Sequence, residues 1–201
     1  ENNTAKTAGM HEYIDIATEN SGATKTAQAL AWDRFCHDIG HALDTEALCA
    51  VPRRVAGLLP KLLLQPYLLT PAQRSAPSDT YGRNRVFICP QDRFSLLAMV
   101  WPAGVTTPIH DHRDWCTLGV YEGIIEETYY SPMTNLADCA TAVPNKSVLH
   151  KPGAIAHLPL DAPNIHRIHN PTDEIAISIH VYGGNCETRG PNLDRIYTVE
   201  G

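Results

Sequence analysis

Two histidines separated by a single residue, His110 and His112, are the first feature of this sequence that could support chemistry. They fall in a β-like segment. Because alternate residues of a strand point the same way, both imidazoles would reach one point inside a barrel. Two neutral ring nitrogens that converge are the beginning of a metal site. On the pair alone, two surface or core histidines without a metal are an equal alternative.

A second feature is a strand-like segment in which Ser178, His180 and Tyr182 alternate with aliphatic residues. Strand geometry places these three polar side chains on one face. The alternative is a half-exposed strand whose polar face is simply solvated, as in many antiparallel sheets. A classical serine hydrolase is not favoured, because Ser178 lies in the middle of the strand without a nucleophile-elbow sequence.

The elements that must position these residues are helical in the first part of the chain and strand-like in the second. Thr26–Leu43 has apolar residues at helical spacing, and Pro52 could begin a second helix that reaches Leu64, although Pro60 should shorten or kink it. From about residue 85 onward, short runs rich in Val, Ile, Thr and Tyr predict an antiparallel sandwich or barrel. These runs are 85–89, 94–101, 117–121, 124–130, 154–158 and 175–182.

This change in pattern predicts one structural domain with two parts. Residues 1–80 are expected to form a helical extension packed on the barrel, and residues 81–201 the barrel itself. The stretch 71–80 contains Ser and Pro and is the best candidate linker, and 131–148 is interpreted as a loop because it has little periodicity.

Composition and charge exclude several classes of protein. The net charge is -6 and no dense Lys/Arg cluster is present, which argues against a nucleic-acid partner. No apolar stretch is long enough to cross a bilayer. The polar start lacks the basic segment followed by an apolar segment that is typical of a secretory signal. The six cysteines contain no C-x-x-C pair and are expected to be reduced thiols. We expect a cytoplasmic protein without nucleic-acid or membrane partners, either a monomer or a weak homo-oligomer.

The spacing around the histidines resembles the two-part motif of the cupins. The first part, G-x5-H-x-H-x3,4-E-x6-G, has Cys116 in place of the glutamate and is otherwise matched by Gly104, His110, His112 and Gly123. The second part, G-x5-P-x-G-x2-H-x3-N, has Asp161 in place of the second glycine and, with a slip of two residues, is matched by Gly153, Pro159, His166 and Asn170. The resemblance implies a mainly β fold, the cupin double-stranded β-helix (jelly-roll) barrel with N-terminal α-helices. It also implies a metal on His110, His112 and His166. The remaining histidines, among them His150 and His169, lack motif support and are interpreted as loop or core residues.

A narrower resemblance is to the thiol dioxygenases, the family of cysteine dioxygenase and bacterial 3-mercaptopropionate dioxygenase. That family combines H-x-H, a later H-x-x-x-N and S-x-H-x-Y, and this sequence carries all three in order over roughly residues 81–182. The resemblance implies one mononuclear non-haem Fe(II), with O2 as co-substrate and a small thiol as substrate that is oxidised to a sulfinate. It further implies that Tyr182 reaches the substrate and oxygen, and that His180 and Ser178 orient it through a hydrogen-bond relay.

The absence of a carboxylate from the histidine motif fits an anionic substrate. Most oxygen-activating non-haem irons have two histidines and a carboxylate, whereas three neutral imidazoles leave the full charge of Fe(II) on the metal. A thiolate suits such a centre, because a bound cation strongly lowers a thiol pKa. Zinc would also bind three histidines. The alternatives are therefore another metal-dependent cupin enzyme, such as an isomerase or a carbon dioxygenase, and a non-catalytic ligand-binding cupin.

Two arginines are candidates for binding a substrate carboxylate, because a guanidinium group can bind it through two hydrogen bonds. Tyr81-Gly-Arg83 resembles the cysteine dioxygenase segment whose arginine grips the carboxylate. The bacterial branch takes its arginine from beyond the S-x-H-x-Y strand, which points to Arg195. For each arginine a solvated surface charge is an equal alternative. Cysteine, 3-mercaptopropionate, mercaptosuccinate and a thione-bearing heterocycle all remain candidate substrates.

Cys116 is a candidate active-site thiol. Some cysteine dioxygenases join a cysteine to the active-site tyrosine, but their cysteine lies five residues after the second histidine, where this chain has Thr117. Cys116 lies four residues after His112, so its side chain points to the same inward face if the strand has no bulge. It could be a packed small residue, a partner of Tyr182 or an additional thiolate ligand, and we prefer packing.

Overall fold

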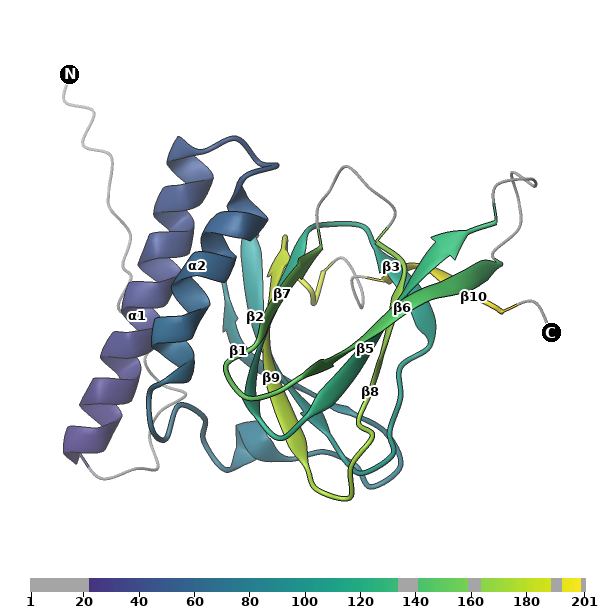
Figure 1. Cartoon of the computed structure of the whole chain (residues 1–201). Coiled ribbons are helices and arrows are strands. Elements are labelled where there is room, and N and C mark those ends of the chain that lie inside the picture. Colours follow the sequence, from purple (N-terminus) through teal and green to yellow (C-terminus); the bar gives the residue numbers. More distant parts are fainter. Residues whose placement is uncertain (1–21, 134–140, 159–163, 189–192, 200–201) are drawn as a thin grey trace.

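The computed structural model describes residues 22–133, 141–158, 164–188 and 193–199. Within these residues two helices come first, followed by ten strands in two antiparallel sheets that face each other (Figure 1). The helices are α1 (Gly22–Thr45) and α2 (Val51–Leu63), followed by a 3-10 turn at Ala72–Arg74. The strands are β1 (Gly82–Ile88), β2 (Phe94–Trp101), β3 (Ile109–His112), β4 (Cys116–Glu122), β5 (Ile125–Pro132), β6 (Ala142–His150), β7 (Ile155–Leu158), β8 (His166–His169), β9 (Ala176–Gly183) and β10 (Leu193–Tyr197).

This architecture confirms the predicted fold class, a mainly β barrel preceded by helices. Pro159 and Asp161 of the second motif lie outside the described residues, as does the start of the predicted helical extension, 1–21. Among the described residues, no helix combines the length and the apolar character that crossing a membrane would require.

The two helices lie against one sheet and follow the apolar patterns of the sequence. Helix α2 carries Pro52 in its first turn, where a missing N–H costs nothing, and it continues past Pro60 to end at Leu63. Phe35 and Ile39 of α1 are buried at helical spacing. Truncating a buried phenylalanine or isoleucine to alanine typically costs about 2–5 kcal/mol of stability. The helices are therefore held by tertiary packing on the sheet.

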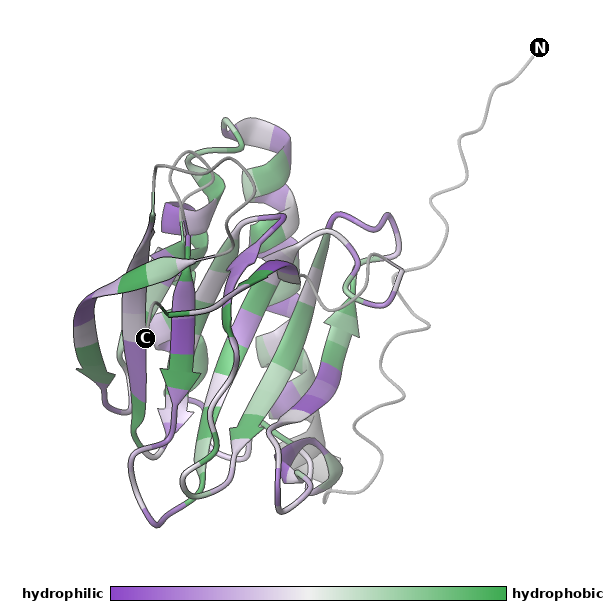
Figure 2. Ribbon diagram, turned by 90° about the vertical axis from the view of Figure 1, so that its right-hand side faces the viewer, coloured by the Kyte–Doolittle hydropathy of each residue, from purple (hydrophilic) through white to green (hydrophobic). Residues whose placement is uncertain are grey.

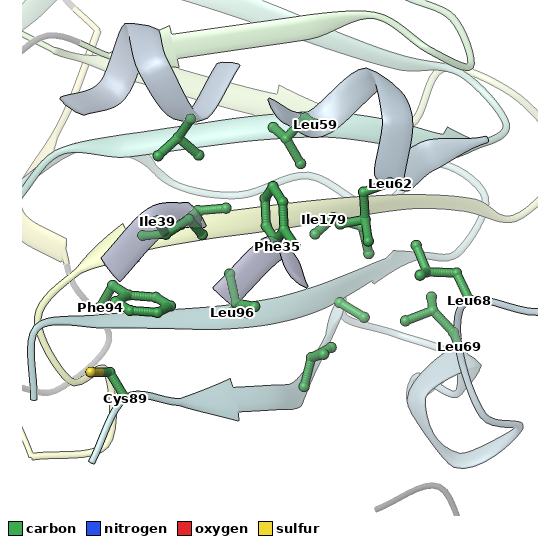
Figure 3. Close-up of a cluster of buried hydrophobic side chains, with 14 of the residues drawn as sticks. Phe35, Ile39, Leu59, Leu62, Leu68, Leu69, Cys89, Phe94, Leu96 and Ile179 are labelled. Carbon is green, nitrogen blue, oxygen red and sulfur yellow. The ribbon is translucent and has the colours of Figure 1, made fainter. Parts of the chain in front are cut away.

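The sheet under the helices has the strand order β1-β2-β9-β4-β7. Every residue of its central strands β2 and β9 is buried, because one face packs on the helices and the other lines the barrel. On the helix side, Leu96 of β2 and Ile179 of β9 join Phe35 and Ile39 in one cluster (Figure 3). On the barrel side, Trp101 and Tyr182 belong to a second cluster. The alternating pattern in β9 therefore does not mark a solvated face, because its polar residues point into the barrel.

The opposite sheet has the order β10-β3-β8-β5-β6 and contains most of what the sequence pattern did not reveal. The loop predicted at 131–148 was wrong at both ends, because β5 extends to Pro132 and residues 142–150 form β6, which pairs along β5. Residues 134–140 of this prediction lie outside the described residues. This strand lies at the sheet edge and is mostly exposed, so no apolar alternation marks it. The short strands β8 and β10 were not predicted either. Figure 2 shows hydrophobic residues spread along the strands and hydrophilic residues gathered in several of the connecting turns.

The motif residues other than histidines have structural roles in the turns. Gly104, Gly123 and Gly153 all have positive φ, and a Cβ at Gly123 would lie 2.6 Å from the Ala176 backbone. Asn170 is fully buried, and its amide donates to the carbonyls of Trp101 at 2.8 Å and Glu174 at 2.7 Å. These residues fix the loops that carry the barrel strands.

The candidate linker at 71–80 is packed against the barrel. The Gln73 amide donates to the carbonyl of Arg85 at 3.2 Å, and the Asn84 amide donates to the carbonyls of Gln73 and Ser75. The division of the chain at residue 80 stays a prediction.

Candidate metal centre

Three histidine side chains meet inside the barrel, two from β3 and one from its neighbour β8. His110 lies directly opposite His166 in the β3–β8 register, and the three rings have centroids 4.6 to 5.0 Å apart. The ligand nitrogens of His110, His112 and His166 all lie within 4.8 Å of one another. The Nε2 atoms of His112 and His166 are only 2.9 Å apart. Such convergence of imidazole nitrogens fits a divalent transition metal.

The outer nitrogens of two of these rings are already committed, which sets their tautomers. Nδ1 of His110 lies 2.8 Å from the carbonyl oxygen of Pro108, so this nitrogen must carry the hydrogen and donate it. Nδ1 of His166 donates in the same way to Oε1 of Glu127 at 2.7 Å. Burial lowers the pKa of His110 to about 3, so its ring is neutral near pH 7. Both rings therefore offer a bare Nε2 to a cation.

Glu127 of β5 was missed by the sequence reasoning, although it is the central residue behind the histidines. Its side chain is wholly buried, and its Oε2 accepts hydrogen bonds from Nε2 of His150 at 2.9 Å and from the Tyr129 hydroxyl at 2.6 Å. Burial alone would raise the pKa of Glu127, but the hydrogen bonds from His150, His166 and Tyr129 outweigh it and hold the pKa well below its usual range. The sequence did contain one signal for Glu127: it lies two residues after the apolar Ile125, so on a strand its carboxylate points to the same inward face. His150, interpreted as a loop or core residue, is buried and belongs to this network.

A second buried chain of hydrogen bonds runs along β9. Nε1 of Trp101 donates to the Ser178 hydroxyl at 2.9 Å, which lies 2.9 Å from Nε2 of His180. Nδ1 of His180 lies 2.9 Å from the Tyr182 hydroxyl oxygen. Ser178, His180 and Tyr182 are all buried, as their place on the barrel face requires.

Trp101 gives this chain a direction, because an indole N–H can only donate. Ser178 accepts from Trp101, and its own hydrogen finds its acceptor in Nε2 of His180. Nδ1 of His180 then carries the ring hydrogen and donates it to the Tyr182 oxygen. Burial lowers the pKa of His180 to about 3, which agrees with a neutral ring. The hydroxyl hydrogen of Tyr182 is not used within this series of hydrogen bonds and can be donated to another acceptor.

Comparison with known proteins identifies the family. The family model described as cysteine dioxygenase type I matches residues 70–189, more than half of the chain. The chain belongs to the cysteine dioxygenase type I family. Membership supports an oxidoreductase of the dioxygenase type at the level of the family, and the buried histidine triad of this member is a possible metal site.

Solved structures with low sequence identity also resemble the chain. A protein from Thermus thermophilus is 17% identical over 58% of this chain and 96% of its own, with a TM-score of 0.43. A cupin 2 conserved barrel domain protein from Salinispora arenicola is 20% identical over 61% of this chain and 97% of its own, with a TM-score of 0.42.

Cys116 of this cysteine dioxygenase type I family member lies beside the tyrosine. It is opposite Tyr182 in the β4–β9 register, and both side chains are buried. Burial raises the pKa of the Cys116 thiol, so the thiol stays neutral. Cys116 is not in the group of side chains that could share a metal with His110. The structure thus places Cys116 in contact with Tyr182 and outside the histidine triad.

A small cavity of about 20 Å³ joins the triad to the end of the relay. Tyr81 and Arg83 line it, together with Trp101 and Tyr182, so the structure brings this arginine to the site. Arg195 does not line this cavity: it is exposed on β10, where its backbone N–H donates to Asp111 at 2.7 Å. A larger groove of about 760 Å³ lies between α1 and α2, and none of the residues predicted for the site lines it.

Proposed function

We propose that this chain is an iron-dependent thiol dioxygenase that adds both atoms of O2 to the sulfur of a small, carboxylate-bearing thiol. One observation carries the proposal: the buried relay ends at the hydroxyl of Tyr182, whose ring lies 5.6 Å from that of His112. A purely structural metal site would not require a hydroxyl group oriented toward it by a series of buried hydrogen bonds. The reaction balances without an added reductant, because a thiolate and O2 together contain the atoms and electrons of a sulfinate.

The three histidines would hold the metal through Nε2 of His110 and His166 and a ring nitrogen of His112. Three protein ligands on an octahedral ion leave positions for other ligands, whereas a structural zinc site is closed by four. When bound, Fe(II) supplies the coordination positions and the redox chemistry that bring a thiolate and dioxygen together. The choice of iron over zinc belongs to the proposal and rests on the family and on the relay.

The relay residues would hold one hydrogen-bond donor at the reacting atoms. Because the Tyr182 oxygen already accepts the N–H of His180, its own hydrogen can be donated to a bound substrate. The neutral state of His180 keeps this arrangement free of a competing proton near pH 7. Tyr182 would thereby orient substrate and oxygen, and burial excludes water from the site.

Arg83 is the proposed anchor for the substrate carboxylate, because it lines the same cavity as the triad and the relay. We expect Arg83→Gln to raise KM at least tenfold for 3-mercaptopropionate and to leave KM for the uncharged 2-mercaptoethanol nearly unchanged. Arg195→Gln is the matched control, since Arg195 is exposed and does not line this cavity. Equal effects of the two substitutions would remove Arg83 from this role.

The proposed function is tested by oxygen consumption. Protein loaded anaerobically with Fe(II) is given cysteine, 3-mercaptopropionate or mercaptosuccinate, and oxygen uptake and product mass are recorded. We expect one of these thiols to gain two oxygen atoms. Zinc-loaded protein should consume no oxygen, and Tyr182→Phe should slow turnover or uncouple oxygen uptake from product. If wild-type protein with bound iron oxidises none of the thiols, the proposal is wrong.

A further inference from the structure

The strongest feature outside the proposed chemistry is the carboxylate of Glu127, which lies directly behind a metal-ligand histidine. Its side chain has 0% exposure, and that of His166 has 1%. Oε1 receives the N–H of His166 at 2.7 Å, and Oε2 receives hydrogen bonds from His150 and Tyr129. A wholly buried acidic side chain with this many donors needs an explanation, because burying a charge is costly unless it is paired.

The hydrogen bonds identify the ionised form of Glu127. A tyrosine hydroxyl and a ring N–H of His166 both donate to it, and an ionised carboxylate is a pure acceptor with room for such bonds on both oxygens. The negative charge therefore resides on the side of the His166 ring opposite Nε2. Because the surroundings are buried, its field is screened much less than it would be in water.

We propose that Glu127 is a positioning residue that supplies, through His166, the negative charge that a centre of three histidines lacks. The cupin motif places a glutamate where this chain has Cys116, so the carboxylate is lost at that position. Here a carboxylate from the next strand, β5, faces the ligand histidine. Its hydrogen bond fixes the ring orientation and makes Nε2 of His166 a more basic ligand.

This arrangement refines the charge argument made from the sequence. Three neutral imidazoles leave two positive charges on a divalent ion, but a buried Glu127 partly compensates them from one side. A more basic ligand favours the more highly charged oxidation state of a metal. The inference rests on the metal centre of the proposed function and not on thiol oxidation, so metal binding and redox potential test it separately from oxygen uptake.

The test is Glu127→Gln, which keeps the size of the side chain and an acceptor for His166 while it removes the charge. We expect Fe(II) and Zn(II) affinities, measured by competition with a chelator, to fall about 10–100-fold. If the lost charge costs Fe(III) tenfold more affinity than Fe(II), the midpoint potential of the bound iron rises by about 59 mV. Unchanged affinity and potential in a folded variant would leave Glu127 with a structural role and overturn the proposal.

A second variant protects the test against misfolding of the first. Tyr129→Phe removes the 2.6 Å hydrogen bond to Oε2 but leaves Glu127 and His166 in place. With one donor fewer, the carboxylate is more basic, so the potential should shift downward, opposite to the shift for Glu127→Gln. Tyr130→Phe is the matched control, because Tyr130 is buried in a different cluster. If Tyr129→Phe leaves the potential equal to that of Tyr130→Phe, the proposal fails whether or not Glu127→Gln folds.

Discussion

Replacing Ser178 by alanine tests the relay at its most sensitive point. The Ser178 hydroxyl is the link between the Trp101 N–H and Nε2 of His180, each at 2.9 Å. Alanine fits the space but leaves both of these buried groups without a partner. His180 also loses the hydrogen bond that determines which of its nitrogens carries the hydrogen. The substitution should therefore affect both stability and the orientation of Tyr182.

The size of the stability effect follows from the two unpaired groups. A buried donor or acceptor left without its partner costs about 1–3 kcal/mol, so two cost at least about 2 kcal/mol. For a protein of this length, each kcal/mol lowers Tm by about 2–4 °C, which gives a decrease of about 4–8 °C at the lower bound. Loss of an orienting partner behind the reacting groups typically lowers activity about 10–100-fold. We expect the decrease in kcat, with a smaller change in KM for the thiol.

Ser95→Ala is the matched control, because Ser95 is another fully buried serine, on the neighbouring strand β2. Its hydroxyl has no hydrogen-bond partner among the described residues. Removing it should leave Tm unchanged or raise it, and should leave turnover intact. Thermal melts of the metal-free proteins and oxygen-uptake kinetics of the Fe(II) forms give the comparison. If Ser178→Ala matches Ser95→Ala in both measurements, the relay reasoning is refuted.

Three further predictions concern metal, loop and thiols. Metal present at about 100 times its Kd should stabilise the protein by about 2.7 kcal/mol, seen as a rise in Tm that a chelator reverses, and an unchanged Tm would argue against a folded-state metal site. Asn170→Ala should cost several kcal/mol in denaturant unfolding, because its side-chain amide donates to the carbonyls of Trp101 and Glu174 and its oxygen accepts the N–H of Thr172, and a loss below about 1 kcal/mol would contradict that role. Alkylation at pH 8 should label exposed Cys49 quickly and Cys36 slowly, because burial raises the pKa of the Cys36 thiol and keeps it protonated; equal labelling rates, mapped by mass spectrometry, would contradict this.

The histidine triad and the relay could be predicted because strand periodicity carries them. Side chains two residues apart on a strand lie on the same face. For this reason His110 and His112 converge, and Ser178, His180 and Tyr182 form a series of hydrogen bonds. Long apolar strands such as β2 were also predictable, since both of their faces are buried. The motif spacing added His166, which no local pattern would have selected.

The parts that sequence reasoning missed depend on pairing between distant segments. Strand β6 is an exposed edge strand, so its conformation comes from backbone pairing with β5 rather than from its own side chains. Glu127 and His150 meet because β5 and β6 pair, and neither residue has a neighbour in sequence that marks it as functional. Arg83 and Arg195 could be separated only in three dimensions, where the first lines the cavity and the second does not.

The most direct test of the account is the origin of the product oxygen atoms. Fe(II)-loaded protein is supplied with 18O2 and the thiol that gives the fastest oxygen uptake. The mass of the product is then measured by mass spectrometry. The account predicts a sulfinate in which both new oxygen atoms carry the label. A product with one labelled oxygen, a disulfide, or an unchanged thiol would contradict it.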